Sequence, residues 1–163
     1  MERSNAITYR SVTNLHVVLV EPEIHWNAGN VGRTCLAAGA RLHLVRPLGF
    51  FLSERQVRRA GLDYWDRVKP RVWDQWDEIE QDLSDLGEPF FFSAEAERSY
   101  WDVAYPEETV LIFGKESVGL SPAIRDKYRD RLVKIPMADP EIRSLNLSTS
   151  VALAVYEVLR QRR

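Results

Sequence analysis

The sequence has very little cysteine: Cys35 is the single one among 163 residues. One thiol forms no disulfide within the chain, and it excludes a zinc site built from several cysteines. Cys35 stands beside Leu36 in a small apolar segment, so we expect it to be a buried hydrophobic side chain. A catalytic thiolate is expected next to a histidine or a pair of basic residues instead.

Long apolar runs are missing as well. No stretch approaches the roughly 20 apolar residues that cross a bilayer as a helix, and the polar segment 1–13 lacks the apolar centre of a secretion signal. Repeats and linkers rich in Gly, Ser or Pro are also missing. We therefore expect a cytoplasmic protein without membrane contact, folded as one domain of ordinary size.

Basic residues are missing from one segment. Nine acidic residues and no Lys or Arg lie between positions 72 and 97, although the formal net charge of the chain is only -2. The chain has 24 acidic residues in all, so 15 acidic residues remain beside 22 basic ones elsewhere. This distribution is compatible with a polyanion bound on one side. A solvated acidic helix with ordinary surface arginines explains the charges equally well.

Apolar strand-like segments alternate with helical patterns. The alternation predicts an α/β fold, a mostly parallel sheet flanked by helices. The expected strands are 15–20, 41–45, 68–72, 89–92, 109–113 and 131–135. The expected helices are 28–38, 53–60, 73–86, a short one after residue 121, and a last one from about residue 146.

Local signals set several of these boundaries. The capping box at 53–56 starts one helix, and Ser121 followed by Pro122 starts another. Gly39 is suited to end the first helix, since a helix C-terminus often needs a left-handed residue. The last helix carries an apolar stripe at steps of three and four: Leu147, Val151, Ala154, Val155, Val158 and Leu159.

Three polar loops follow expected strands, where ligands bind in open parallel sheets. Loop 27–34 holds two glycines but not the dinucleotide pattern G-x-G-x-x-G, and a tight turn with a surface arginine explains it equally well. Loop 114–120 resembles a phosphate-binding loop but lacks its lysine, which excludes an NTPase. Loop 136–148 contains Ser144 and Asn146, and both residue types are good helix caps. Residue types and spacing alone give no reaction.

Together the loops resemble the three signature motifs of the SPOUT methyltransferases, in the branch that methylates ribose 2'-OH groups of tRNA and rRNA. The resemblance covers about residues 15–161. The segments that carry it are LVEPEIHWNAGNVGRTCLAAG, RLHLVRPLGF, VRRAGLDYW, LIFGKESVGL and IPMADPEIRSLNLSTSVALAVYE. The patterns EPEIxxNxGNxxR, RRAGLDYW and RSLNLS resemble most closely the subfamily that acts on the wobble nucleotide, cytidine or uridine 34 of tRNA.

The resemblance implies a single SPOUT domain over residues 15–163, with a deep C-terminal trefoil knot and an N-terminal extension over residues 1–14. It implies S-adenosyl-L-methionine as cofactor, released as S-adenosyl-L-homocysteine, and no metal. It also implies tRNA as the partner, and a homodimer that forms through the knot region.

Residue by residue, the family motif implies two functional sets. The catalytic set is Arg33, Asn27, Glu116, Ser144 and Asn146, and the cofactor-binding set is Phe92, Gly114, Ile135 and Ser144. Because the pKa of arginine exceeds about 12, Arg33 either fixes the phosphate beside the target ribose or accepts a proton once its charge is suppressed. Glu116 would pair with Arg33 or brace its loop. Candidate phosphate contacts are Arg55, Arg58, Arg59 and Arg143, and for the first three a solvated helix face is an equal explanation.

Two other functions stay open. A sister enzyme could methylate a different ribose in tRNA or rRNA, and only the RNA product distinguishes the two. A module that keeps the fold and binds RNA without catalysis would hold the cofactor and transfer no methyl group.

Overall fold

The computed structural model describes residues 14–53, 55–60 and 64–163, without the side chains at positions 58 and 60. The expected N-terminal extension, residues 1–14, therefore lies outside the described residues except for Asn14. Within the described ranges, six strands form one sheet in the order β3-β2-β1-β5-β4-β6, and every pairing is parallel. This sheet confirms the expected α/β class. The trefoil knot stays a prediction.

The strands of the sheet match the apolar segments of the sequence. They are β1 (Leu15–Val20), β2 (Arg41–Val45), β3 (Arg71–Trp73), β4 (Glu88–Phe92), β5 (Thr109–Phe113) and β6 (Leu132–Val133). The helices are α1 (His25–Ala38), α2 (Arg55–Ala60), α3 (Trp65–Val68), α4 (Trp76–Leu86), α5 (Pro122–Lys127) and α6 (Leu147–Gln161). Two 3-10 turns, η2 (Tyr100–Asp102) and η3 (Arg129–Arg131), complete the described elements.

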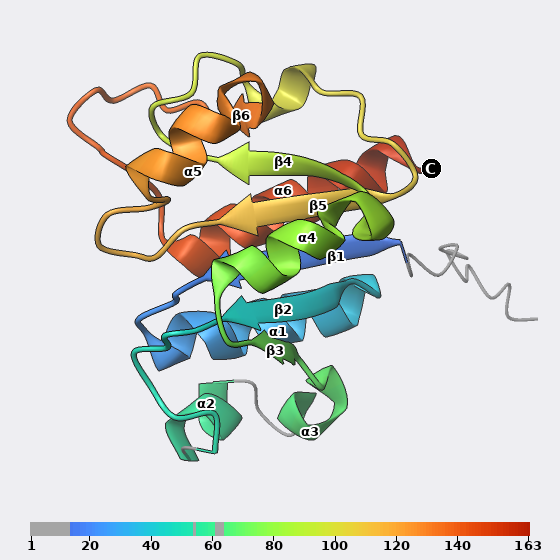
Figure 1. The fold of residues 1–163 in the computed structure, drawn as a ribbon, viewed down its shortest axis with the longest axis vertical. Coiled ribbons are helices and arrows are strands. Elements are labelled where there is room, and N and C mark those ends of the chain that lie inside the picture. Colours follow the sequence, from blue (N-terminus) through green and yellow to red (C-terminus); the bar gives the residue numbers. More distant parts are fainter. Residues whose placement is uncertain (1–13, 54, 61–63) are drawn as a thin grey trace, which may run out of the picture.

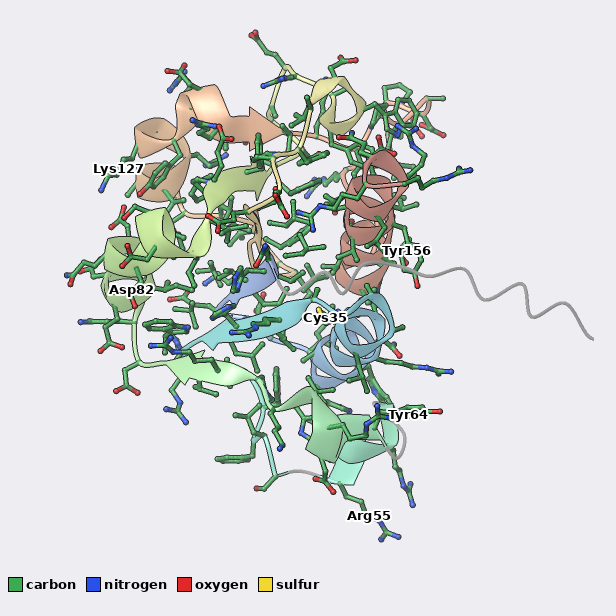
Figure 2. The ribbon with its side chains drawn as sticks, turned by 90° about the vertical axis from the view of Figure 1, so that its right-hand side faces the viewer. Cys35, Arg55, Tyr64, Asp82, Lys127 and Tyr156 are labelled. Atoms are coloured by element: carbon green, nitrogen blue, oxygen red, sulfur yellow. The ribbon has the colours of Figure 1, made fainter. Side chains whose placement is uncertain are left out.

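The sheet lies between two layers of helices. In Figure 1 the strands run across the molecule, with α2 and α3 beside the β3 edge. Figure 2, turned by 90°, shows α4 and α5 on one side of the sheet and α1 and α6 on the other. In the described part of the chain, no helix is both long and apolar enough to cross a membrane.

The central strand β1 contributes to a core on each side of the sheet. Leu15, Val17 and Leu19 pack with α1 and α6, whereas Val18 and Val20 pack with α4 and α5. Burying such a side chain stabilises the fold by about 1.5–3 kcal/mol. Because parallel strands are covered on both faces, all six residues of β1 are buried, and His16 is the one that is not apolar.

Two predictions about buried side chains are confirmed. Cys35 is buried in the core on the α1 side, and burial raises the pKa of its thiol to about 12, so the thiol stays protonated at neutral pH. The apolar stripe of the last helix is buried along its whole length: Leu147, Val151, Ala154, Val155, Val158 and Leu159.

The boundary between β3 and α4 differs from the expectation of a strand at 68–72 and a helix from 73. Val68 ends the short helix α3, and the strand runs over Arg71–Trp73. Trp73 pairs with Val45 in the ladder, and its indole donates a hydrogen bond to His43. The helical spacing of Trp73 was therefore misleading, because its partners lie on the neighbouring strand.

Two other elements also differ in extent. α1 begins at His25 rather than at about residue 28, because a group from another loop serves its N-terminus, as described below. The strand expected at 131–135 is reduced to Leu132–Val133, since these two residues alone pair with β4. Ile135 lies beyond the ladder and is left to line a cavity.

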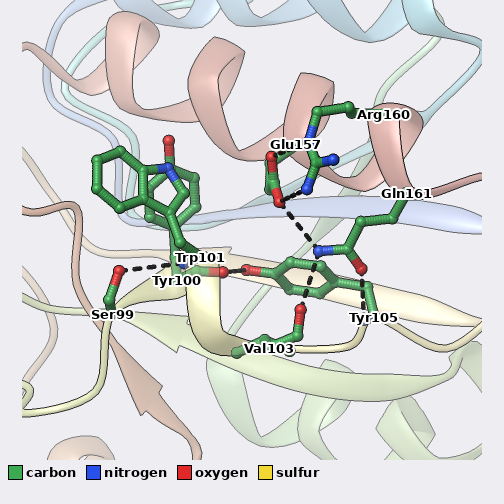
Figure 3. A network of polar contacts seen from close by, with 8 residues as sticks. All are labelled: Ser99, Tyr100, Trp101, Val103, Tyr105, Glu157, Arg160 and Gln161. Atoms are coloured by element: carbon green, nitrogen blue, oxygen red, sulfur yellow. Dashed lines mark hydrogen bonds and ion pairs between the residues drawn. The ribbon is translucent and has the colours of Figure 1, made fainter.

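A polar network holds the C-terminal end of α6 against the segment between β4 and β5 (Figure 3). Gln161 accepts a hydrogen bond from the backbone N–H of Tyr105 and donates one to the carbonyl of Val103. Glu157 accepts from Arg160 and Gln161, and the bond from Arg160 is the main cause that lowers the pKa of Glu157. The end of α6 is thus held by directional hydrogen bonds in addition to its apolar packing.

Two buried histidines join β1 to β2 and β3. Trp73 Nε1 donates to His43 Nδ1 at 3.1 Å, and His43 Nε2 lies 2.9 Å from His16 Nδ1. An indole N–H only donates, so His43 accepts at Nδ1 and, when neutral, carries its proton at Nε2 toward His16. Burial is the main cause that lowers the pKa of both histidines, that of His43 to about 3.

We expect acid to destabilise the fold through this cluster. Between the ordinary histidine pKa of 6.5 and about 3, unfolded His43 binds a proton that folded His43 does not. The free energy of unfolding therefore falls as the pH is lowered through this window. Urea unfolding at a series of pH values should show a shallower fall for His43→Gln, whose amide can also accept from Trp73 and donate to His16. The His25→Gln control lies outside the cluster, and equal slopes in wild type and His43→Gln would contradict the assignment.

Candidate functional site

The carboxyl ends of β1 and β5 lie side by side at the centre of the sheet, where the strand order reverses. In open parallel sheets, ligands bind outside such a reversal point. A cavity of about 850 Å³ opens there, between the loops that follow β4, β5 and β6 and the start of α6. Ligand cavities in proteins measure roughly 300–1,000 Å³, so this one is large enough for a small-molecule ligand.

Most of the sequence-predicted site residues line this cavity: Asn27, Phe92, Gly114, Glu116, Ile135, Arg143, Ser144 and Asn146. The remaining ones do not. Arg33 is exposed on α1, and its side chain has no hydrogen bond or ion pair with the described residues. Arg55 and Arg59 are exposed on α2, while the side chain of Arg58 lies outside the described atoms.

The Glu116 carboxylate reaches the N-terminus of α1 from the loop after β5. Its Oε1 accepts the backbone N–H of Glu23 at 2.9 Å, and its Oε2 accepts the N–H of Ile24 at 2.6 Å. Ile24 is the N-cap of α1 and has no capping side chain, so Glu116 serves backbone groups that no local residue serves. A carboxylate here also complements the positive end of the helix dipole.

The segment 27–34, expected as a loop, is helical, and Asn27 lies in the first turn of α1. Asn27 links Glu116 to Asn146, so one chain of hydrogen bonds joins the start of α1, the loop after β5 and the start of α6. The Asn146 Oδ1 accepts the backbone N–H groups of Ser148 and Thr149 and so caps α6. Its Nδ2 must then be the group that donates to Asn27 Oδ1, at 3.0 Å. The Asn27 Nδ2 in turn donates to Glu116 at 3.2 Å. The orientation of both amides is thus fixed by backbone donors at one end and a carboxylate at the other.

Two further contacts join the loop after β1 to the loop after β5. Glu23 accepts from the N–H and the hydroxyl of Ser117, and these bonds are the main cause that lowers the pKa of Glu23. Lys115 forms an ion pair with Glu21 at 3.3 Å. None of these four residues was predicted from the sequence. Each is an ordinary polar loop residue there, and its partner is recognised only once the fold brings the two loops together.

The loop after β5 is closed on itself by two glycines. The N–H of Gly119 donates to the carbonyl of Lys115 at 2.9 Å, and Gly119 has a left-handed φ of 70°. A Cβ on Gly114 would lie 2.1 Å from the backbone of Gly119, so no side chain fits at that position. Glycine is required at Gly114 for close approach and favoured at Gly119 for its backbone angle.

The cavity wall combines aromatic rings with cationic groups. The rings of Phe92 and Phe113 stack with centroids 4.5 Å apart at the ends of β4 and β5. Arg125, Lys134 and Arg143 also line the cavity, and Arg125 forms an ion pair with Glu95. This wall suits a ligand with both an apolar ring and charged ends. Among the described residues, no three His, Cys, Asp or Glu side chains are grouped as metal ligands.

Several known proteins are similar to this chain in sequence and in fold. Residues 14–156 match the SpoU rRNA Methylase family. A tRNA (cytidine(34)-2'-O)-methyltransferase from Burkholderia pseudomallei is 44% identical over 148 residues, which cover 90% of this chain and 94% of that relative.

Solved structures with a similar fold include two methyltransferase-related proteins. One, determined for a study of the 2-OH methylation of C/U34 on tRNA, has a TM-score of 0.86 and 45% identity, and the match covers 92% of this chain and 97% of that chain. The methyltransferase AviRb from Streptomyces viridochromogenes has a TM-score of 0.81 over 96% of this chain and 62% of that chain. At 23% identity, AviRb shows a likeness of fold alone.

We expect Asn27 and Asn146 to be energetically coupled. Asn27 is buried, whereas Asn146 is exposed. Asn146→Ala leaves the buried Asn27 oxygen without its donor, and an unpaired buried polar group costs about 1–3 kcal/mol. Urea unfolding of Asn27→Ala, Asn146→Ala and the double variant should therefore give a coupling energy of about 0.5 kcal/mol or more. Ser121→Ala removes the cap of the separate helix α5, so its effect should add to that of Asn27→Ala. Simple additivity in the Asn27 and Asn146 pair would show that the chain of hydrogen bonds does not form.

Proposed function

The chain belongs to the SpoU rRNA Methylase family, and on this premise we propose that it methylates the ribose 2'-OH of nucleotide 34 in tRNA. The methyl donor is S-adenosyl-L-methionine, and S-adenosyl-L-homocysteine is the product. The observation that carries the proposal is the chain of hydrogen bonds from Glu116 through Asn27 to Asn146. It brings three segments far apart in sequence, the start of α1, the loop after β5 and the start of α6, to one cavity of suitable size.

The cavity fits the cofactor in size and chemistry. Phe92 and Ile135 offer apolar surface to a nucleoside, and Gly114 lets the loop backbone come close, while Ser144 supplies a hydroxyl. The bound cofactor supplies a methyl group that is already electrophilic because it is attached to a sulfonium. The protein therefore has to orient the ribose hydroxyl and help it lose its proton, and positioning alone contributes much of the rate.

We assign Arg33 to the phosphate beside the target ribose, where its charge would orient the 2'-OH. Asn27, Glu116 and Asn146 already satisfy one another, so we assign them to hold the start of α1 and the start of α6 in register. The exposed Arg33 lies outside the cavity wall of its own chain. A homodimer that forms through the knot region would bring the Arg33 of one copy to the cavity of the other.

The substrate explains the remaining charges. The wobble nucleotide lies in an unpaired loop and is reached without melting a helix, and its 2'-OH distinguishes RNA from DNA. Arg143 at the cavity and Arg55 and Arg59 on α2 are exposed and available to phosphates, and Arg58 is assigned with them from the sequence. We further propose one methyltransferase domain over residues 15–163, an N-terminal extension over residues 1–14, and a cytoplasmic location, where tRNA is found.

The purified protein should transfer labelled methyl groups to total tRNA from cells that lack the enzyme. Nuclease digestion and mass spectrometry should then find a 2'-O-methyl group on nucleotide 34 of one or a few tRNAs. Label on another ribose, of tRNA or rRNA, would keep the reaction and reject the position. Cofactor binding with no label on any RNA would indicate a binding module without catalysis.

Arg33→Ala should lower methyl transfer by about 100-fold or more, since a reacting group that is misplaced by about 1 Å can cost that much. Cofactor affinity, measured by calorimetry, should stay within a factor of two or three of wild type, because Arg33 is assigned to the RNA phosphate and does not line the cofactor cavity of its own chain. Arg129→Ala is the matched control, since that arginine is also exposed, and its side chain forms an ion pair with Asp126 far from α1 in sequence. Near-normal turnover by Arg33→Ala would reject the assignment.

A further inference from the structure

Helix α1 presents an exposed stripe that continues from the site. Trp26, Asn30 and Arg33 are spaced at i, i+4 and i+7, which places them on one face of the helix. All three are exposed, and the Trp26 side chain is 49% exposed. From the first to the last, the stripe spans about 10 Å along the helix axis.

Trp26 does not itself line the cavity, but it is next in sequence to a residue that does. Its neighbour Asn27 belongs to the chain of hydrogen bonds, and Ile24 lines the cavity. The Trp26 ring lies against the ring of His25, with centroids 4.7 Å apart and an angle of 41° between the planes. The indole is therefore supported on one side and exposed elsewhere. Among the described residues, the buried Nε2 of His25 has no hydrogen-bond partner.

The charge on α1 indicates which partner suits the stripe. From His25 to Ala38 the helix has no acidic residue, and Arg33 is its single Lys or Arg. The Glu116 carboxylate already complements the partial positive charge of the helix N-terminus, so Arg33 supplies the positive charge of the stripe. Proteins that bind single-stranded nucleic acid combine such a surface with an exposed aromatic side chain, on which a base stacks. A single exposed aromatic residue is common on protein surfaces, so the assignment depends on the line that Trp26 forms with Arg33.

We propose that Trp26 is a stacking platform for an unpaired base of the tRNA anticodon loop, next to the nucleotide whose phosphate Arg33 contacts. The inference rests on the proposed function and extends it, because it names the side chain that holds the loop in register. Trp26 is a positioning residue: it orients the target nucleotide and takes no part in methyl transfer.

A double-mutant cycle that combines protein variants with altered RNAs tests the proposal. The affinity of an anticodon stem–loop RNA would be measured by fluorescence anisotropy for wild type, Trp26→Ala and Trp26→Phe, with the full-length protein and bound cofactor. Stacking is worth about 1–3 kcal/mol per base, so Trp26→Ala should weaken binding by about fivefold or more. Trp26→Phe, which keeps a ring, should recover most of the loss. Trp101→Ala removes the other strongly exposed tryptophan, on η2, and should bind like wild type.

RNAs with one base removed at each loop position identify the stacked nucleotide. At that position the abasic RNA should bind wild type more weakly, and Trp26→Ala should lose nothing further. If the losses from protein and RNA add at every position, the stacking assignment is wrong. If Trp26→Ala folds poorly, Trp26→Leu, which removes the ring and keeps an apolar side chain, takes its place in this comparison.

Two other outcomes separate this inference from the function on which it rests. If wild type methylates nucleotide 34 and Trp26→Ala matches it in RNA affinity and KM, the inference alone fails. If wild type methylates no RNA, the proposed function fails, and the inference that rests on it fails as well. Loss of dimer by Trp26→Ala in analytical ultracentrifugation, with unchanged RNA affinity per intact dimer, would assign the stripe to contact between copies and overturn the proposal.

Discussion

The site depends on one carboxylate at the start of one helix. Glu116 accepts two backbone N–H groups and the Asn27 amide, and it comes from a loop more than 80 residues away in sequence. A helix N-terminus without a local cap leaves donors that must find acceptors. Here the acceptor, Glu116, also lines the cavity. The hydrogen bonds that stabilise the start of α1 therefore also hold the loop after β5 against the loop after β1.

The same logic extends to α6 through the two asparagine amides. Asn146 caps α6 with its oxygen and has only its nitrogen left for Asn27. Each amide has one acceptor and one donor end, so the chain of bonds runs in one direction only. Replacing either amide by an isosteric carboxylate would remove the donor of one link and set two oxygens against each other. The functional loops are therefore coupled by chemistry that tolerates little substitution, while the cavity beside them remains open for a ligand.

Local patterns predicted much of the fold and only part of the site. The apolar segments of β1, β2 and β5, the Ser121 cap and the stripe of α6 are local features, and the structure agrees with them. The misassigned elements depend on distant partners: Trp73 on His43, and the first turn of α1 on Glu116. Family resemblance named Glu116 and both asparagines. It gave no sign that they bond to one another, nor that Glu23 and Ser117 would join the same loops.

The rigid start of α1 has a consequence for whatever binds its exposed face. A helix transmits direction over its whole length, because each residue is fixed at 100° from the last. Once Glu116 and Asn146 hold the first turn, the direction of every exposed side chain on α1 is set relative to the cavity. Arg33 lies two turns from the cavity rim, yet its position depends on these bonds. Removing Glu116 would therefore alter both the cavity wall and the place where the exposed stripe presents a ring and a cation to RNA.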